Sequence, residues 1–358
     1  MIDLSRFFSK KYGSLIPYAP GEQPKDRVFI KLNTNESPFP PSPKALAYAQ
    51  EAAKDLQLYS DPECRALVQT AARHLGVEEE EILFTNGSDE ILNFAFMAFC
   101  DRGVVFPDIT YGFYKVYAAL NGVPYREIPL KPDFSIDVSD YCGVNKAIFI
   151  ANPNAPTGLC LPLSDIETIV RSNPDTVVVI DEAYIDFGGE SALPLIKKYN
   201  NLLITQTFSK SRSMAGARLG MGIGCKELIR DLNTIKYSTN PYNINRMTMA
   251  AGIGALEDDD YFRANCRTVT ENRTWTAGQL TDLGFTLTDS KTNFLFAKHP
   301  AISGKALYRE LRERGILVRH FDTPRLTDFI RVTVGSKCQM ETFIHAVDSI
   351  LNAGRTHP

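Results

Sequence analysis

The feature that most constrains the fold of this chain is a run of four β-branched residues at 177–180, which is followed directly by Asp181. Such a run predicts a strand that is covered on both faces, as in parallel sheets. A second apolar run at 202–205 precedes Lys210. Because open α/β sheets bind ligands at the carboxyl ends of their strands, we expect Asp181 and Lys210 to lie at one edge of a sheet.

Strand and helix patterns alternate over the first two thirds of the chain. Further short strands are predicted at 82–85, 103–106, 125–129, 146–151 and 221–224. Between the first two of these, apolar residues surround most of a predicted helix at 89–99. This alternation predicts an α/β fold of three layers, in which helices cover both faces of a mainly parallel sheet.

The pattern changes after about residue 246, where a long helical stretch precedes short strands and a closing helix at 339–351. This change predicts a second, smaller α/β domain. The first forty residues are rich in proline and loop signals, which is typical of an arm. We therefore expect an N-terminal arm at 1–35 that packs with the small domain, a large domain at 36–245 and a small C-terminal domain at 246–358.

The composition is that of an ordinary soluble enzyme. Hydrophobic residues make up 44% of the chain and charged residues 23%, with a formal net charge of −3, so no general attraction to nucleic acid or to an anionic membrane is expected. The seven cysteines form no Cys-x-x-Cys pair, which argues against a disulfide framework and against a zinc site. We expect no metal, no membrane span and a cytoplasmic location.

A polar turn at 86–89 joins a predicted strand to a predicted helix. Backbone N–H groups and the positive end of the helix dipole would face this turn, an arrangement that suits a phosphate group. The alternative is a plain capping turn. A second loop, at 152–158, contains two prolines and a glycine that fix its path, with a possible cis peptide bond, and it is expected to place an amide side chain.

Lys210 follows a turn rich in hydroxyl groups, Thr207-Phe208-Ser209, and precedes several small residues. A lysine that is removed from water beside cationic or electron-poor groups becomes a nucleophilic amine and can form a Schiff base. The nearby glycines at 220, 222 and 224 do not form a dinucleotide-binding fingerprint, because the third glycine of G-x-G-x-x-G would fall at Cys225.

Taken in order, these motifs resemble the fold-type I aminotransferases that use pyridoxal phosphate. The matching segments are 87–90, 152–158, 181–184, Ser209-Lys210, Arg218 and Arg331. Within that family, the segments 17–18, 32–36, 59–64, 110–112 and 330–335 are similar to the pattern of the histidinol-phosphate aminotransferases. The resemblance covers nearly the whole chain, and the joint order of its motifs is more specific for the cofactor than for the substrate.

The resemblance implies a catalytic set of Lys210, Asp181 and Tyr184. Lys210 would bind pyridoxal phosphate covalently through a Schiff base and, once displaced, move a proton between substrate and cofactor. Asp181 would pair with the pyridine nitrogen and Tyr184 with the phenolic oxygen. The cofactor-binding residues that it implies are Tyr59, Ser88, Asp89, Tyr111, Asn154, Asp181, Ala183, Tyr184, Thr207, Ser209, Lys210 and Arg218.

The resemblance also implies a substrate site and a partner. Arg331 would grip the anionic end of the substrate, with Arg319 as a second arginine that suits a phosphate, and Tyr18 and Asn35 would contact the substrate from the arm. Tyr59 and Tyr242 match residues that reach into the neighbouring subunit's site in this family. They therefore imply a homodimer with shared active sites, with Tyr242 at the substrate.

One position departs from the family pattern. Ala155 precedes Pro156-Thr157-Gly158, where the family usually has an asparagine that contacts the phenolic oxygen of the cofactor. Either Asn154 takes over that contact or Tyr184 makes it alone.

The expected activity is the transfer of an amino group between histidinol phosphate and 2-oxoglutarate in histidine synthesis. Two alternatives share the fold: an aromatic or other amino-acid aminotransferase, and a threonine-phosphate decarboxylase. A binding module without catalysis is disfavoured, because a structural role does not need an acid and an amine at neighbouring strand ends. A nicotinamide-dependent oxidoreductase is disfavoured by the glycine spacing.

Overall fold

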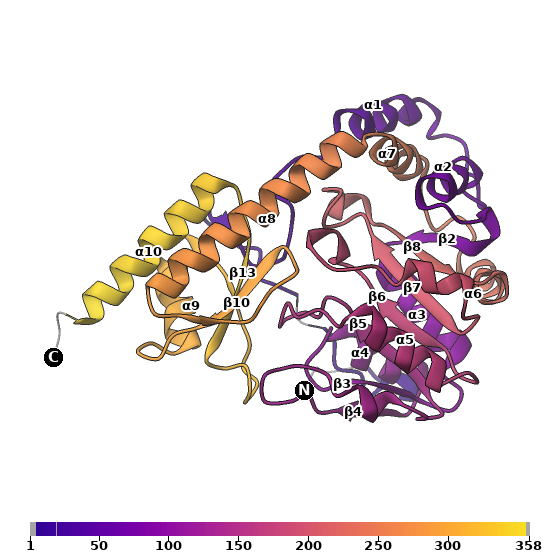
Figure 1. Cartoon of the computed structure of the whole chain (residues 1–358). Coiled ribbons are helices and arrows are strands. Elements are labelled where there is room, and N and C mark those ends of the chain that lie inside the picture. Colours follow the sequence, from indigo (N-terminus) through magenta and orange to yellow (C-terminus); the bar gives the residue numbers. More distant parts are fainter. Residues whose placement is uncertain (1–4, 19, 356–358) are drawn as a thin grey trace.

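The computed structural model describes residues 5–18 and 20–355 (Figure 1). Its largest sheet has seven strands in the order β2-β8-β7-β6-β5-β3-β4. Their bounds are β2 (Ile82–Asn86), β3 (Val104–Pro107), β4 (Tyr125–Ile128), β5 (Ala147–Ala151), β6 (Val178–Asp181), β7 (Leu202–Thr207) and β8 (Leu219–Gly224). β8 runs antiparallel to both of its neighbours, β2 and β7, and the other pairs of described strands in this sheet are parallel. The prediction of a mainly parallel sheet is confirmed.

Helices cover both faces of this sheet. On one face Val178 and Ile180 of β6 belong to a core that includes residues of α1 (Pro43–Ala52), α2 (Arg65–Leu75), α5 (Leu163–Ser172) and α7 (Arg246–Glu257). On the other face Val179 belongs to a core built with α3 (Ser88–Phe99), α4 (Phe113–Asn121) and α6 (Lys226–Thr239). Alternate residues of one strand thus enter two cores, which explains the continuous apolar run in the sequence.

A four-stranded antiparallel sheet forms the second lobe, in the order β12-β13-β10-β9. Its strands are β9 (Thr286–Leu287), β10 (Phe294–Lys298), β12 (Arg319–His320) and β13 (Phe329–Thr333). Residues of α8 (Asp259–Asp282), α9 (Gly304–Glu313) and α10 (Lys337–Arg355) share a core with this sheet. Figure 1 shows α8 running from this lobe to α7 beside the larger one.

The N-terminal segment lies against the second lobe. Its strand β1 (Ile30–Lys31) pairs in parallel with β11 (Ile316–Leu317). Before that strand, Glu22 accepts hydrogen bonds from Tyr308 and Arg312 of α9. Helix α7 packs against α1 and α2 of the larger lobe, although the sequence prediction began the small domain at 246. The domain boundaries at 35/36 and 245/246 remain predictions.

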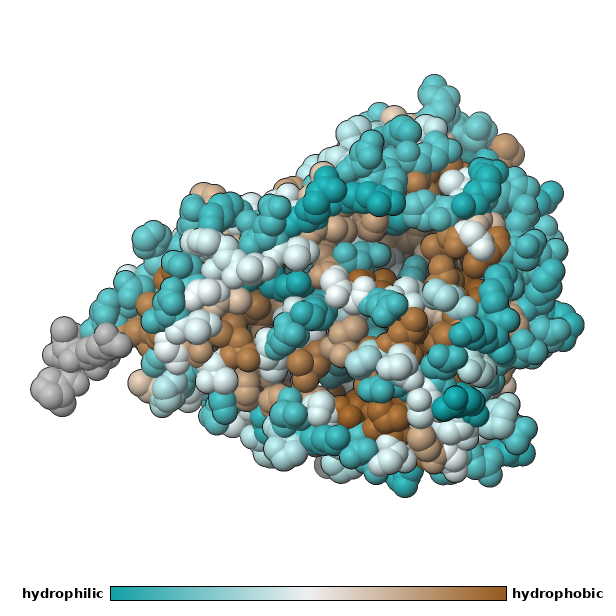
Figure 2. Space-filling view, viewed as in Figure 1, coloured by the Kyte–Doolittle hydropathy of each residue, from teal (hydrophilic) through white to brown (hydrophobic). Residues whose placement is uncertain are grey.

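The register of the central strands brings polar residues to one edge of the sheet. Asp181 at the end of β6 is aligned with Ala151 of β5 and with Thr205 of β7. Because these three strands are parallel, the loops that follow them open on the same side. Polar residues cover most of the face in Figure 2, and apolar residues are confined to separate patches there.

Candidate active site

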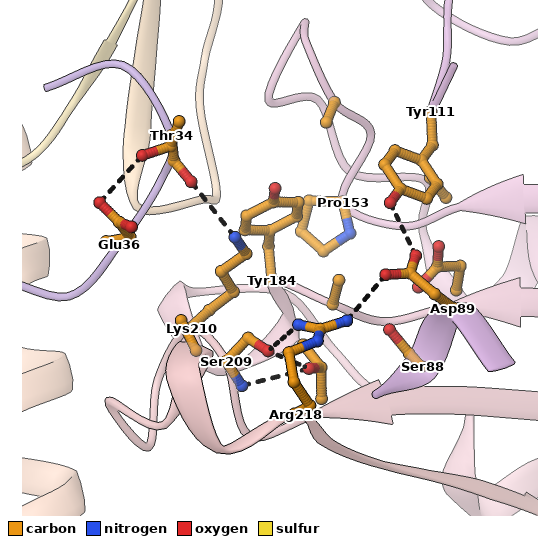
Figure 3. A pocket seen from close by; sticks show the side chains of 16 residues that line it. Thr34, Glu36, Ser88, Asp89, Tyr111, Pro153, Tyr184, Ser209, Lys210 and Arg218 are labelled. Atoms are coloured by element: carbon orange, nitrogen blue, oxygen red, sulfur yellow. Dashed lines mark hydrogen bonds and ion pairs between the residues drawn. The ribbon is translucent and has the colours of Figure 1, made fainter. Parts of the chain in front are cut away.

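A cavity of about 290 Å³ opens at the carboxyl edge of β5, β6 and β7 (Figure 3). Side chains from segments far apart in the sequence surround it. Its lining includes Thr34, Glu36, Ser88, Asp89, Tyr111, Ala155, Asp181, Ala183, Tyr184, Thr207, Ser209, Lys210 and Arg218. Acid, amine, guanidinium and aromatic groups thus face one space, as expected from the strand ends.

Asp181 lies at the bottom of this cavity and is 4% exposed. Its Oδ2 accepts a hydrogen bond from the Tyr114 hydroxyl at 3.0 Å, and its Oδ1 accepts one from Thr205 Oγ1 at 3.1 Å. Burial away from water raises the pKa of Asp181 to about 6, although both hydrogen bonds act in the opposite direction. A cationic group beside Asp181 would favour its charged form.

One side of the cavity offers hydrogen-bond donors that suit an anion. Helix α3 begins at Ser88, and the first N–H groups of a helix have no partner within the helix. Arg218 donates from Nη2 to Asp89 Oδ2 at 2.9 Å and from Nη1 to Ser209 Oγ at 3.5 Å. Thr207 donates to Ser209 Oγ at 3.0 Å. These groups could hold a phosphate.

This side of the cavity depends on a close approach of β8 to α3. A Cβ atom placed on Gly220 would lie 2.2 Å from the backbone nitrogen of Ser88. A Cβ atom on Gly87, whose φ is +76°, would lie 2.5 Å from Arg218 Nη2. Glycine is therefore required at both positions, because any side chain would push the arginine or the helix start away.

Lys210 reaches into the cavity from the loop after β7. Its Nζ donates to the carbonyl oxygen of Thr34 at 3.4 Å, and it lies 5.9 Å from the centre of the Tyr184 ring. Across from it, Glu36 accepts hydrogen bonds from Lys31 and Thr34. Burial acts to raise the pKa of Glu36, yet these bonds and the charges of Lys31 and Lys210 lower it overall.

Two tyrosines form walls of the cavity. The Tyr111 hydroxyl donates to Asp89 Oδ1 at 2.7 Å, and burial followed by the nearby Asp89 charge raises the pKa of Tyr111. The Tyr184 hydroxyl accepts a hydrogen bond from Asn35 Nδ2 at 2.9 Å. Asp89 therefore fixes both Tyr111 and Arg218, so its side chain has a role beyond the backbone contact that the sequence suggested.

A second cavity of about 420 Å³ shares Tyr111, Tyr184 and Lys210 with the first. Arg331 lines it, and burial lowers the pKa of this guanidinium. Arg331 Nη2 donates to the carbonyl oxygen of Asn33 at 3.2 Å, whereas the buried Nε has no acceptor among residues 5–18 and 20–355. An anionic group in this cavity would satisfy that donor.

The sequence profile of the family "Aminotransferase class I and II" matches residues 27–350. This chain belongs to that family. A histidinol-phosphate aminotransferase of Brachyspira hyodysenteriae is 49% identical over 352 residues, which cover 97% of this chain and 99% of that protein. A histidinol-phosphate aminotransferase of Clostridium acetobutylicum is 47% identical over 347 residues, which cover 96% of this chain and 99% of that protein. The resemblance stated from the motifs is confirmed.

The fold of a solved structure agrees with this assignment. The crystal structure of histidinol-phosphate aminotransferase from Sinorhizobium meliloti, in complex with pyridoxal-5'-phosphate, superimposes with a TM-score of 0.88. It is 25% identical to this chain, and the match covers 99% of this chain and all of that one. The expected architecture, with a mainly parallel sheet and a smaller α/β lobe, is that of a fold-type I aminotransferase.

This aminotransferase brings most of the predicted site residues together. The first cavity collects Ser88, Asp89, Tyr111, Asp181, Ala183, Tyr184, Thr207, Ser209, Lys210 and Arg218. The second cavity collects Tyr18, Asn35, Arg319 and Arg331. Their roles toward a ligand remain proposals.

Asn154 is one of the predicted cofactor contacts that lie outside the first cavity. Its amide donates to the carbonyl oxygen of Ile109 and to Thr157 Oγ1, both at 3.0 Å, and accepts from Thr110 Oγ1 at 2.9 Å. It does not line the first cavity, whereas Ala155 does. The amide holds two loops together, and its contact with the cofactor remains a prediction. Both X-Pro bonds of this loop are cis.

Tyr59 and Tyr242 lie outside both cavities of their own subunit. Their rings stack on each other with centroids 4.7 Å apart, and Tyr59 is 81% exposed. Arg246 Nη2 holds this segment by donating to the carbonyl oxygen of Tyr59 at 2.7 Å. Neither ring lines the cavities of this chain, and the expected contact with a neighbouring subunit remains a prediction.

Two residues that the sequence reasoning missed hold Asp181. Tyr114 lies three residues beyond Tyr111, and Thr205 is the polar residue that ends the run at 202–205. A polar residue at the end of a buried strand could have marked Thr205, because its neighbour in the sheet is Asp181. Nothing in the local pattern marks Tyr114.

Two further findings concern ligands and membranes. Within residues 5–18 and 20–355, no group of three or more histidine, cysteine, aspartate or glutamate side chains could hold a metal ion. The helices of the same residues include none that is long and apolar enough to cross a membrane.

The raised pKa of Asp181 predicts a pH-dependent stability of the ligand-free protein. Because the folded value of about 6 exceeds the ordinary value, the neutral carboxyl stabilises the fold at low pH, and this contribution disappears as the pH rises through 6. Asp181→Asn should therefore gain on the order of 2 to 3 kcal/mol of unfolding free energy relative to the wild type between pH 4 and 7.

Urea unfolding of both proteins at a series of pH values measures this difference. Glu182, whose pKa is raised to about 7 by burial, titrates in both proteins and cancels in the comparison. Parallel stability curves for the two proteins would contradict the raised pKa of Asp181.

Proposed function

We propose that this protein is a histidinol-phosphate aminotransferase that uses pyridoxal phosphate. It would convert histidinol phosphate and 2-oxoglutarate to imidazole-acetol phosphate and glutamate, and the reverse, in histidine synthesis. The observation that carries the proposal is the cavity in which Lys210, Asp181 and the anion-binding groups face one another. The relatives at 47% and 49% identity support the choice of substrate.

The residues present fit pyridoxal phosphate. The start of α3 with Thr207, Ser209 and Arg218 would hold the phosphate, and Tyr111 with Ala183 would lie on the faces of the ring. Bound pyridoxal phosphate supplies a ring that accepts electrons from the substrate carbon when its proton is removed. The donor set of this chain thus matches an aromatic ring with an anionic tail.

Asp181 would keep the ring nitrogen protonated. Tyr114 and Thr205 hold its two oxygens, so the carboxylate has little freedom to turn away from the ring. Because the carboxylate is removed from water, its charge acts at short range with little screening. Replacing Asp181 by a neutral residue would leave the nitrogen without that support.

Lys210 would bind the cofactor covalently and then serve as the base. Its amine lies between the carbonyl oxygen of Thr34 and the ring of Tyr184, so it can move between the two cavities that it lines. In that position it could take a proton from the substrate carbon and deliver it to the cofactor. Tyr184 would donate a hydrogen bond to the phenolic oxygen.

The second cavity would take the substrate. Arg331, whose buried Nε has no acceptor in the described chain, would bind the anionic end of the substrate together with Arg319. A phosphate can accept hydrogen bonds from two guanidinium groups at once. Tyr18, which packs on Phe113 with centroids 4.4 Å apart, would close the cavity from the arm.

The proposal includes a homodimer in the cytoplasm with shared active sites. The stacked and exposed pair Tyr59 and Tyr242 supports it, because such rings are common in protein interfaces. Exposed leucines at 56 and 58 adjoin Tyr59 in the chain and would widen this apolar surface. Tyr59 would then contact the cofactor, and Tyr242 the substrate, of the neighbouring subunit.

A comparison of amino donors tests which substrate the protein prefers. With pyridoxal phosphate bound, histidinol phosphate should aminate the cofactor at concentrations on the order of a hundredfold below those of phenylalanine, because charge-assisted contacts to phosphate favour it by about 2 to 3 kcal/mol. Single-turnover absorption spectra measure this directly. Preference for phenylalanine would indicate an aromatic aminotransferase, and carbon dioxide release from threonine phosphate would indicate a decarboxylase.

Two arginine variants serve as controls for this measurement. Arg331→Ala should remove most of the preference for histidinol phosphate. Arg314→Ala should keep it, because Arg314 bonds to Glu310 of α9 and lines neither cavity.

Subunit mixing tests the shared active sites. Tyr59→Ala and Lys210→Ala should each be nearly inactive alone, since one damages the neighbouring site and the other its own site. In a refolded equal mixture, half of the dimers would carry one intact site, so activity should recover to about a quarter of the wild-type value. Activity no greater than the sum of the two separate variants would show that Tyr59 does not serve the partner's site.

A further inference from the structure

Asn35 occupies an unusual position between the two lobes. It is 2% exposed, and its φ of +56° is a conformation that residues other than glycine and asparagine rarely adopt. Its backbone N–H donates to Thr333 Oγ1 at 2.9 Å, and its carbonyl oxygen accepts from Asn293 Nδ2 at 3.0 Å. The backbone is thus fixed on both sides, and the side chain is held at one place.

The amide of Asn35 bridges Thr333 and Tyr184. Its Oδ1 accepts from Thr333 Oγ1 at 3.1 Å, and its Nδ2 donates to the Tyr184 hydroxyl oxygen at 2.9 Å. This side chain was expected to contact the substrate. Its hydrogen bonds link two residues of the protein instead.

The orientation of the amide follows from the hydrogen of the Thr333 hydroxyl. Thr333 Oγ1 already accepts the Asn35 N–H, and its own hydrogen needs an acceptor because Thr333 is 2% exposed. Asn35 Oδ1 provides that acceptor only in the orientation described here. With the amide reversed, Nδ2 would face the same oxygen and the Thr333 hydrogen would lose its acceptor.

The orientation of the Asn35 amide decides in which direction the Tyr184 hydroxyl can donate its hydrogen. Because Asn35 Nδ2 donates to the Tyr184 oxygen, the Tyr184 hydrogen cannot point along that contact. Tyr184 lines both cavities, so its hydrogen is available on their side. Ala155 lines the same two cavities and has no side-chain donor, which increases the importance of the Tyr184 hydroxyl there.

We propose that Asn35 is a positioning residue that makes Tyr184 a hydrogen-bond donor toward the phenolic oxygen of the bound cofactor. The inference rests on the function proposed above, and it assigns the amide to Tyr184 in place of the substrate. Lys210 and Arg331 are charged groups that face Tyr184, and the Asn35 variants leave both residues in place.

The test is the pH titration of the absorption band of the protein-bound cofactor. A hydrogen bond to the phenolic oxygen stabilises its anionic form, so Tyr184→Phe should raise the apparent pKa of that band by about one pH unit. Asn35→Asp places an acceptor at the same site with nearly the same shape. It should draw the Tyr184 hydrogen away from the cavity and raise the apparent pKa by at least as much.

A double-mutant cycle separates the shift that acts through the Tyr184 hydroxyl from the shift caused by the negative charge that Asn35→Asp adds. In the Tyr184→Phe background, Asn35→Asp should cause only the smaller shift that is due to its charge. Asn35→Gly, which suits the positive φ, should give a partial shift that also vanishes in that background. Thr333→Val, which removes the group that orients the amide, should shift the band in the same direction.

Three results distinguish the possible failures. Equal shifts from Asn35→Asp with and without the Tyr184 hydroxyl would overturn the inference, because the amide would not act through Tyr184. A loss of thermal stability or cofactor affinity without any shift would also overturn it and leave Asn35 a structural role. Absence of a titrating band in the wild-type protein supplied with pyridoxal phosphate would instead contradict the proposed function.

Discussion

The buried carboxylate of Asp181 is the constraint on which the rest of the site depends. A charged group at the end of a central strand is costly unless neighbouring groups compensate for its loss of water. Tyr114 and Thr205 supply two hydrogen bonds, yet the pKa of Asp181 is still raised by burial. The site is therefore organised to favour a cation next to this carboxylate, which is the property that a pyridine ring with a protonated nitrogen supplies.

The reversed direction of β8 builds the other end of the site. Because β8 runs antiparallel to β7, the chain turns back after Lys210 and brings Arg218 to the start of α3. Gly220 allows this close approach, since a side chain there would collide with the Ser88 backbone. The segment between β7 and β8 thus carries both the Lys210 amine and the Arg218 guanidinium. The pairing of these two strands fixes the distance between the two groups.

Much of this arrangement could be predicted from the sequence. The apolar runs of β6 and β7 predicted the sheet, and the residues that end or follow them, Asp181 and Lys210, predicted the edge at which the first cavity lies. The hydrogen-bond partners could not be predicted in the same way. Tyr114 and Asp181 are separated by 67 residues, and Asn35 and Tyr184 by 149, so their contacts depend on how the helices and lobes pack.

The position of the Asn154 amide could not be predicted for a related reason. A polar residue next to a departure from the family pattern was a reasonable substitute, but the loop directs the Asn154 amide toward Ile109 and Thr157, while Ala155 faces the cavity. In the proposal made above, Asn35 would compensate in a different way, from its position between the two lobes. The local sequence identified Ala155 as the departure from the family pattern. How the site accommodates this alanine depends on tertiary packing.

The most direct test of the central claim is the ionisation of Asp181 with and without the cofactor. Carboxyl carbon NMR, with the Asp181 signal assigned from Asp181→Asn, would follow that titration. Without ligand, the pKa of Asp181 should lie near 6, and with pyridoxal phosphate bound the carboxylate should remain charged to a much lower pH. An unchanged titration on binding would contradict the claim that Asp181 pairs with the ring nitrogen of the cofactor.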